Sequence, residues 1–199
     1  MKINRLAILP VLAIFPLLTS CGKVPQAEID AATVAVENAK TAQADLYVQA
    51  EFMALQDSLS AVMAAIETEK SKLFKSFKDE SEKLTAVVTL AGQVAANAQV
   101  RKQEMKAEAE TILAALMNVM TENEALLVKA PKGKEGKAAL EAIKGDLDVI
   151  TSGIADAQAL LASDDVINAL NKVQALKDKA DAINVELTGV IEKYSARRR

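Results

Sequence analysis

Apolar residues recur at alternating steps of three and four along most of this chain, which is the spacing that places them on one face of an α-helix. Five such stripes follow one another, at residues 29–46, 52–73, 84–126, 140–161 and 166–194. No stretch sustains the apolar–polar alternation of a β-strand. The pattern therefore predicts an all-α protein made of long amphipathic helices.

The boundaries between the stripes differ in clarity. Residues 129–137 contain a proline and two glycines among four lysines, and they predict a basic loop. The stripe changes heptad phase within residues 74–84, which indicates either a turn or a bend in one long helix. Near residues 44–47, Asp45 could cap a new helix, although the alanine-rich flanks also allow a continuous one.

The last boundary predicts a tight antiparallel hairpin. Ser163 precedes Asp164 and Asp165, a pattern typical of an N-cap followed by acids in the first helical turn. Together the stripes favour an elongated four- or five-helix bundle with coiled-coil-like antiparallel packing. Its long-helix region would cover residues 27–128, and its C-terminal hairpin residues 138–199. Alanine-rich seams bury little apolar area per turn, so a protein partner or a second copy of the chain is expected.

The N-terminal residues follow the pattern of an export signal. Residues 1–5 are basic and residues 6–18 are apolar, a run of signal-peptide length that is too short to span a bilayer and contains Pro10 and Pro16. We expect residues 1–20 to be cleaved and residues 21–26 to form a tether.

The segment Leu18-Thr19-Ser20-Cys21 resembles the lipobox of bacterial lipoproteins. The resemblance implies cleavage before Cys21 and acylation of its thiol, and two or three acyl chains hold a protein firmly on a membrane. An aspartate at the next position retains enterobacterial members of this class in the inner membrane. Gly22 therefore implies the outer membrane, facing the periplasm. The alternative is a buried free cysteine beside an ordinary signal.

Two weaker resemblances concern the rest of the chain. Residues 25–32 and Tyr47 are similar to an alanine-rich helical domain of unknown function in outer-membrane lipoproteins, which implies an envelope location and no known reaction. The overall form resembles Braun's lipoprotein, which cross-links through a terminal lysine. This chain carries Arg197, Arg198 and Arg199 instead, so that linkage is not expected. The tail could contact peptidoglycan carboxylates or anionic lipids, or could complement a helix dipole.

Composition narrows the function further. The 199 residues include one cysteine and no histidine, which excludes Ser-His-Asp catalysis, histidine-bearing metal sites and CxxC redox pairs. We therefore expect neither an enzyme nor a cofactor. The net charge is −3, and it becomes −5 once the signal and its two basic residues are removed. An acidic body argues against nucleic-acid binding.

Several charged residues have both a functional and a plain interpretation. The acidic cluster of Glu104, Glu108 and Glu110 could supply acid–base catalysis, but a solvated helix face explains it more simply. Arg101 and Glu69 lie at stripe positions, where they could fix helix register or mark a partner site. They could equally lie where a helix emerges into solvent. The polar stretch 100–110 is expected to project beyond the bundle core.

The mature aromatic residues lead to the last alternative. Phe74, Phe77 and Tyr47 could line an apolar groove, or they could plug the bundle where its helices diverge. The favoured function is a lipid-anchored envelope protein that acts as a helical spacer, scaffold or interaction module. The alternative is a periplasmic carrier or chaperone that binds apolar ligands or unfolded chains in a groove between helices.

Overall fold

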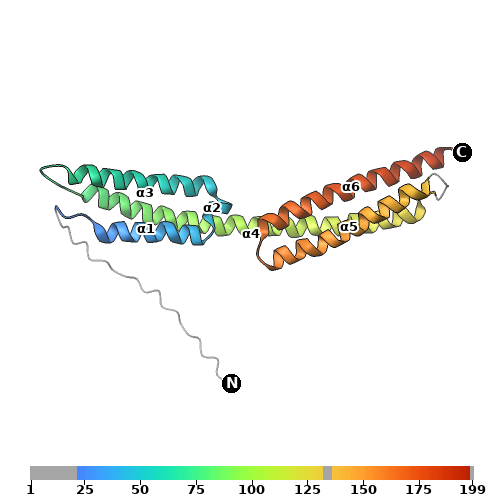
Figure 1. Ribbon diagram of the computed structural model, residues 1–199, viewed down its shortest axis with the longest axis horizontal. Helices are drawn as coiled ribbons and strands as arrows, with labels where there is room; N and C mark the ends of the chain where they lie inside the picture. Colours follow the sequence, from blue (N-terminus) through green and yellow to red (C-terminus); the bar gives the residue numbers. More distant parts are fainter. Residues whose placement is uncertain (1–21, 132–135, 198–199) are drawn as a thin grey trace, which may run out of the picture. The chain divides into compact units, whose positions relative to one another are not determined.

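The computed structural model describes residues 22–131 and 136–197, and this part of the chain is folded into six α-helices without a strand. The helices are α1 (Gln26–Thr41), α2 (Ala44–Tyr47), α3 (Gln49–Lys70), α4 (Lys78–Lys129), α5 (Gly136–Ala162) and α6 (Val166–Arg197) (Figure 1). The all-α prediction is confirmed.

The helices form two compact units that share α4. Unit 1 contains α1, α3 and the part of α4 that ends at Val94. Unit 2 contains α2, α5, α6 and the part of α4 that begins at Ala95. Each unit therefore packs three long helical segments around a seam of its own.

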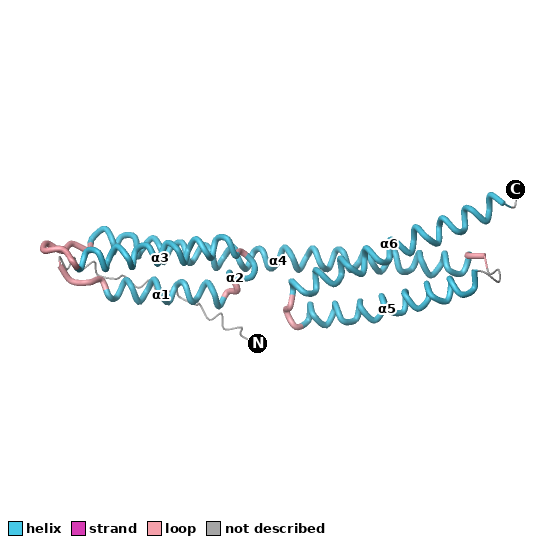
Figure 2. Tube along the Cα trace, turned by 45° about the horizontal axis from the view of Figure 1, so that its top comes forward, coloured by secondary structure: helices cyan, strands magenta, loops and turns pink. Residues whose placement is uncertain are grey.

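In unit 1, α1, α3 and the first part of α4 lie side by side (Figures 1 and 2). Each contributes one stripe of buried side chains, as the three–four spacing predicts. The buried apolar residues are Ile29, Ala32, Val36 and Ala39 from α1, Phe52, Leu55, Val62 and Ile66 from α3, and Leu84, Val87, Ala91 and Val94 from α4. Three of these twelve positions are alanine, and all three lie on α1 and α4.

Unit 2 has a core formed mainly by α4, α5 and α6. Its main cluster comprises Leu116, Met120, Ala130, Ile143, Leu147, Ile150, Ala180, Ile183 and Leu187. The helices α5 and α6 form the antiparallel hairpin that the sequence predicts, and the ion pairs Lys172–Asp156 (2.6 Å) and Lys179–Asp146 (2.7 Å) cross it on the outside. Gly153 lets the hairpin close tightly, because a Cβ at that position would lie 2.7 Å from Leu176 Cδ2.

Two predicted helix starts are corrected at the level of single residues. The break near residue 44 is real, but Asp45 lies in the first turn of α2 and the residue before the helix is Gln43, in a left-handed conformation with φ 64°. Ser163 does not cap α6, since its hydroxyl donates to Leu160 O at the end of α5. Asp164 turns the chain with φ 64°, and α6 begins after Asp165.

The buried stripe of α4 changes register where the helix passes between the units. It follows the predicted positions as far as Ala98, but the next buried residue is Lys102 and not Arg101, which is exposed. The buried positions Val94, Ala98 and Lys102 are four residues apart, where the pattern predicts a step of four followed by a step of three. The stripe then continues through Ala109, Leu113 and Leu116. The stretch 100–110 consequently keeps buried residues and does not project beyond the core as predicted.

Candidate functional site

The structure first describes the chain at Gly22, directly after the predicted lipid attachment residue Cys21, which lies outside the described residues. Gly22 has a φ of 99°, a conformation that glycine adopts readily. The chain enters α1 soon afterwards, since the Gln26 amide donates to Val24 O and the Ile29 amide to Pro25 O. Residues 22–25 thus lead directly into α1 of unit 1.

The start of α1 lies beside the start of α4. Ser81 Oγ donates to Glu28 Oε1 over 3.3 Å, which joins the first turns of the two helices. The segment 71–77, which connects α3 to α4, therefore lies at the same end of unit 1 as the tether, as Figures 1 and 2 also show. The heptad phase change within residues 74–84 reflects a turn and not a bend.

The carboxylate of Glu69 stabilises this turn through two interactions. Glu69 is buried at the end of α3, where it accepts a hydrogen bond from the Ser76 amide (3.0 Å) and pairs with Lys72 Nζ (2.5 Å). The hydrogen bond from Lys72, aided by the one from Ser76, lowers the pKa of the Glu69 carboxyl below its ordinary 4.5. Of the two sequence interpretations, Glu69 fits neither a register-setting seam residue nor a solvated helix end. It fastens a turn.

Two of the three aromatic residues grouped by the sequence, Phe74 and Phe77, lie in this turn and differ in exposure. Phe77 is buried, with 4% of its surface exposed, and it anchors the entry into α4. Phe74 is 90% exposed and its neighbour Leu73 is 92% exposed. Phe74 therefore neither plugs the bundle nor lines a groove. Leaving a leucine or phenylalanine in water forgoes about 1.5–3 kcal/mol per side chain.

Lysines border the exposed pair. Lys70 and Lys72 precede it, and Lys75 and Lys78 follow it. Lys70 pairs with Glu67 (2.6 Å) and Lys72 with Glu69. In the part of the chain that the structure describes, no ion pair is formed by Lys75 or Lys78. We call Leu73, Phe74 and the four bordering lysines the apolar tip.

A second polar site lies in unit 2 around Lys102, whose residue surface is 7% exposed. Its Nζ donates to Gln43 Oε1 (2.9 Å) and to Asp164 Oδ2, and it lies 5.7 Å from the centre of the Tyr47 ring. Among the described residues, the two non-glycine residues with positive φ are Gln43 and Asp164. Lys102 therefore joins both strained turns to the middle of α4.

The same site changes the ionisation of its tyrosine. Burial raises the pKa of Tyr47 above 10.0, and the Asp164 and Asp165 carboxylates raise it further, while the Lys102 ammonium opposes the shift. Tyr47 thus remains a neutral phenol that covers one side of a buried cation. It neither plugs diverging helices nor lines a groove. This is a bracing arrangement, and a lysine already engaged by an acceptor and a carboxylate is not free to act as a nucleophile.

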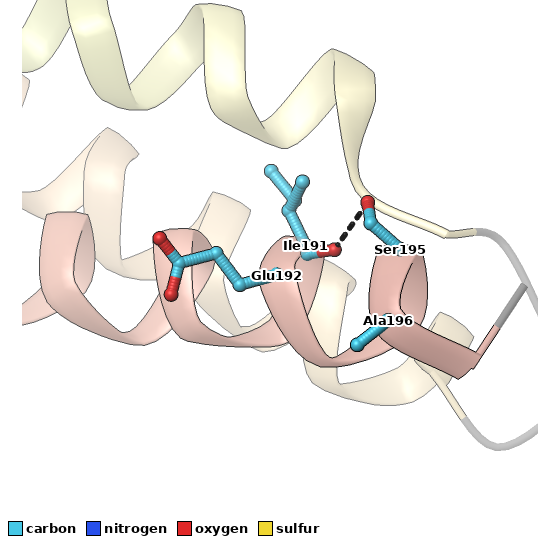
Figure 3. Close-up of a pocket in the computed structure, with 4 residues that line it drawn as sticks. All are labelled: Ile191, Glu192, Ser195 and Ala196. Atoms are coloured by element: carbon cyan, nitrogen blue, oxygen red, sulfur yellow. Dashed lines mark hydrogen bonds between the residues drawn. The ribbon is translucent and has the colours of Figure 1, made fainter. Parts of the chain in front are cut away.

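Two hollows on the described part of the chain are open to solvent. One of about 370 Å³ lies near the end of α6 beside Ile191, Glu192, Ser195 and Ala196 (Figure 3). There the Ser195 hydroxyl donates to Ile191 O (2.9 Å), and the Glu192 carboxylate points away from it. Another of about 220 Å³ lies between α3 and α4. Neither is lined by Phe74 or Phe77, the residues that the carrier hypothesis requires.

The predicted acidic cluster lies on the surface of α4. Glu104 accepts from Arg101 Nη1 (3.3 Å), and Glu108 and Glu110 are exposed. Over residues 22–131 and 136–197, no group of three or more acidic or thiol side chains is arranged to hold a metal ion. Arg197 ends α6 and is exposed, while Arg198 and Arg199 lie outside the described residues.

One described helix, α4, is long and apolar enough to cross a bilayer by length and composition alone, with 17% of the relevant window buried. Core helices of soluble proteins satisfy the same criterion, so it does not show whether α4 crosses a bilayer or lies in a folded bundle.

Comparisons with known proteins give no match to any family model, curated protein or solved structure. The lipoprotein resemblance of residues 18–21 and the resemblance of the α1 region therefore stay predictions.

Proposed function

We propose that this protein is a lipid-anchored component of a bacterial cell envelope, held through acylated Cys21 and acting as a helical spacer or scaffold for other proteins. The observation that carries the proposal is the lipobox-like segment at Leu18–Cys21, followed within a few residues by a folded helix. That arrangement would hold unit 1 close to the membrane surface and leave its helical faces available to partners.

The structure of the described residues supports a scaffold in two ways. Both units bury a set of apolar side chains, and the two hollows described above are open to solvent. The polar groups inside them are engaged in bracing turns, as Glu69 and Lys102 are. A carrier with a deep groove between its helices is the less favoured alternative, because no described hollow contains the aromatic residues expected to line it.

Gly22 favours the outer membrane, facing the periplasm, by the rule for enterobacterial lipoproteins. The exposed Arg197 and the arginines after it would give the far end of α6 a positive charge suited to anionic lipids or peptidoglycan. This second contact would be electrostatic and sensitive to salt.

The direct test is Cys21→Ala in the full-length protein expressed in its bacterial host. We expect an uncut, unacylated precursor, because the thiol that accepts the lipid is missing. Mass spectrometry of the N-terminus and membrane fractionation provide the readout. Ser20→Ala is the matched control, since it keeps a small residue before the cleavage site and should be processed normally.

Unchanged processing and membrane retention in Cys21→Ala would overturn the anchor. For the scaffold role, chemical crosslinking in the intact envelope should capture a defined set of protein neighbours in the wild type and lose it in Cys21→Ala. Copurification of lipid with the detergent-free, unacylated protein would instead support the carrier alternative.

A further inference from the structure

We propose that the apolar tip of unit 1 is a second membrane contact, which inserts Leu73 and Phe74 into the same anionic bilayer that holds Cys21. This inference rests on the proposed lipid anchor and adds to it a site formed by the folded chain. The occupant of the exposed pair would be a phospholipid surface carrying negative headgroups.

The first argument is position. The step from Cys21 to Gln26 covers at most about 18 Å of extended chain, so acyl chains on Cys21 would keep the start of α1 near the membrane. The Ser81–Glu28 hydrogen bond fixes the start of α4 beside the start of α1. The turn immediately before α4 is therefore at the end of unit 1 that the anchor would bring to the bilayer.

The second argument is presentation. The turn is held on one side by Glu69 and on the other by buried Phe77, so its shape is determined by the fold. Among the described residues that are large and apolar, Leu73 and Phe74 are the two most exposed. A fixed turn that presents its two central apolar residues to solvent needs less ordering on insertion than a mobile one.

The third argument is charge. Residues 70–78 contain four lysines and no acid, in a chain whose body is acidic, and acids resume directly on either side at Glu69 and Asp79. Two of the lysines are paired with glutamates set back along α3, whereas Lys75 and Lys78 keep their charges available. Lysines beside an inserted apolar pair can extend their ammonium groups to the headgroup phosphates. A protein partner would not require these like charges beside the exposed pair.

The test uses the acylated full-length protein with a single reporter thiol. Cys21 is the only cysteine, and acylation blocks its thiol, so Phe74→Cys supplies one reactive site for an environment-sensitive fluorophore. The control is Val149→Cys, at a 60% exposed position on α5. Both proteins are reconstituted in vesicles of phosphatidylethanolamine and phosphatidylglycerol, with or without lipids that carry a nitroxide on the acyl chain.

We expect a blue-shifted emission and several-fold stronger quenching by the nitroxide lipids at residue 74 than at residue 149. Replacing phosphatidylglycerol with phosphatidylcholine, or introducing Lys75→Glu with Lys78→Glu, should weaken that quenching. A probe at residue 74 that stays as accessible to water as the control overturns the inference. A probe that is shielded from water but untouched by the nitroxide lipids also overturns it, because the occupant would then be protein.

The N-terminal mass of the same sample separates the two proposals. An acylated Cys21 with a water-exposed tip leaves the anchor standing and removes the tip contact. An unacylated Cys21 overturns the anchor and, with it, the geometry that would bring the tip to the bilayer. Quenching that does not respond to lipid charge or to the lysine substitutions overturns the anionic preference.

Discussion

Units 1 and 2 share helix α4, yet their buried polar side chains are used in different places. In unit 1, Glu69 lies at the end of α3 and fastens the turn that carries the apolar tip. In unit 2, Lys102 and Asn123 lie on α4 within the unit, and each contacts another part of the chain. In unit 1 a buried charge therefore stabilises the turn that carries the exposed apolar tip. In unit 2 the buried polar groups connect helices and turns of the same unit.

The seams are alike in composition but differ in one buried polar residue. Unit 1 buries Ala32, Ala39 and Ala91 beside larger side chains, and the main cluster of unit 2 includes Ala130 and Ala180 beside leucine and isoleucine. Asn123 interrupts that cluster with no exposed surface. Its Nδ2 donates to Ala180 O (2.7 Å), and its Oδ1 has no partner. Unit 2 therefore buries an amide oxygen without a hydrogen-bond partner, which costs free energy of folding.

The largest expected effects test whether the two units are separate cooperative units. Leu55 in unit 1 and Leu187 in unit 2 are both fully buried, so Leu55→Ala and Leu187→Ala should each lower the free energy of unfolding by about 3 kcal/mol. Native-state amide hydrogen exchange should accelerate in α1 and α3 for the first variant, and in α5 and α6 for the second. Equal acceleration throughout both units would show that they unfold as one.

The sequence predicts each unit well because the three–four spacing within a unit is set by its own helices. Four of the five stripes give buried residues that largely match the structure, and α5 and α6 form the expected C-terminal hairpin. Residues 132–135 of the expected basic loop lie outside the described residues. Capping was predicted less well. Asp45 and Ser163 are common capping residue types, but the turns beside them are formed by left-handed Gln43 and Asp164.

The bracing site around Lys102 could not be predicted, and the reason is local ambiguity. Arg101 and Lys102 are adjacent and both cationic, so a strict heptad continues through the first and gives no reason to choose the second. The choice is made by Gln43 and Asp164, which lie 59 and 62 positions away in sequence. The exposure of Phe74 could not be predicted for a related reason. Aromatic residues are usually buried, and only the structure of the turn shows that Phe74 faces solvent while Phe77 is buried.

A second prediction compares the loss of the ion pair at the buried Lys102 with the loss of an exposed ion pair in the same unit. Asp164→Asn leaves the Lys102 ammonium with neutral acceptors only, and we expect a loss of about 1–2 kcal/mol in the free energy of unfolding. The loss is smaller than for a fully buried pair because 62% of the Asp164 side chain is exposed. Adding Lys102→Met to Asp164→Asn should recover most of it, since the charge that needed solvation is then gone.

The matched control is Asp156→Asn, which breaks the outward-facing pair with Lys172 on the same hairpin. It should change stability by less than about 0.5 kcal/mol. Urea unfolding of the four proteins measures all of these effects. Equal losses in Asp164→Asn and Asp156→Asn would mean that Lys102 is solvated and does not brace the turns.

The smallest expected effect concerns the buried carboxylate of unit 1. Because the folded-state pKa of Glu69 lies below its ordinary 4.5, its ionised form stabilises the fold above that pH, and the stabilisation disappears as pH falls through the folded-state pKa. Glu69→Gln keeps an oxygen that can accept from the Ser76 amide but loses the ion pair with Lys72. The wild type should therefore be the more stable protein at about pH 7, and the difference should shrink as the pH is lowered below 4.5, as measured by urea unfolding. If the stability difference did not change with pH, the turn would be held by hydrogen-bond geometry alone, and the charge on Glu69 would have no part in presenting the apolar tip.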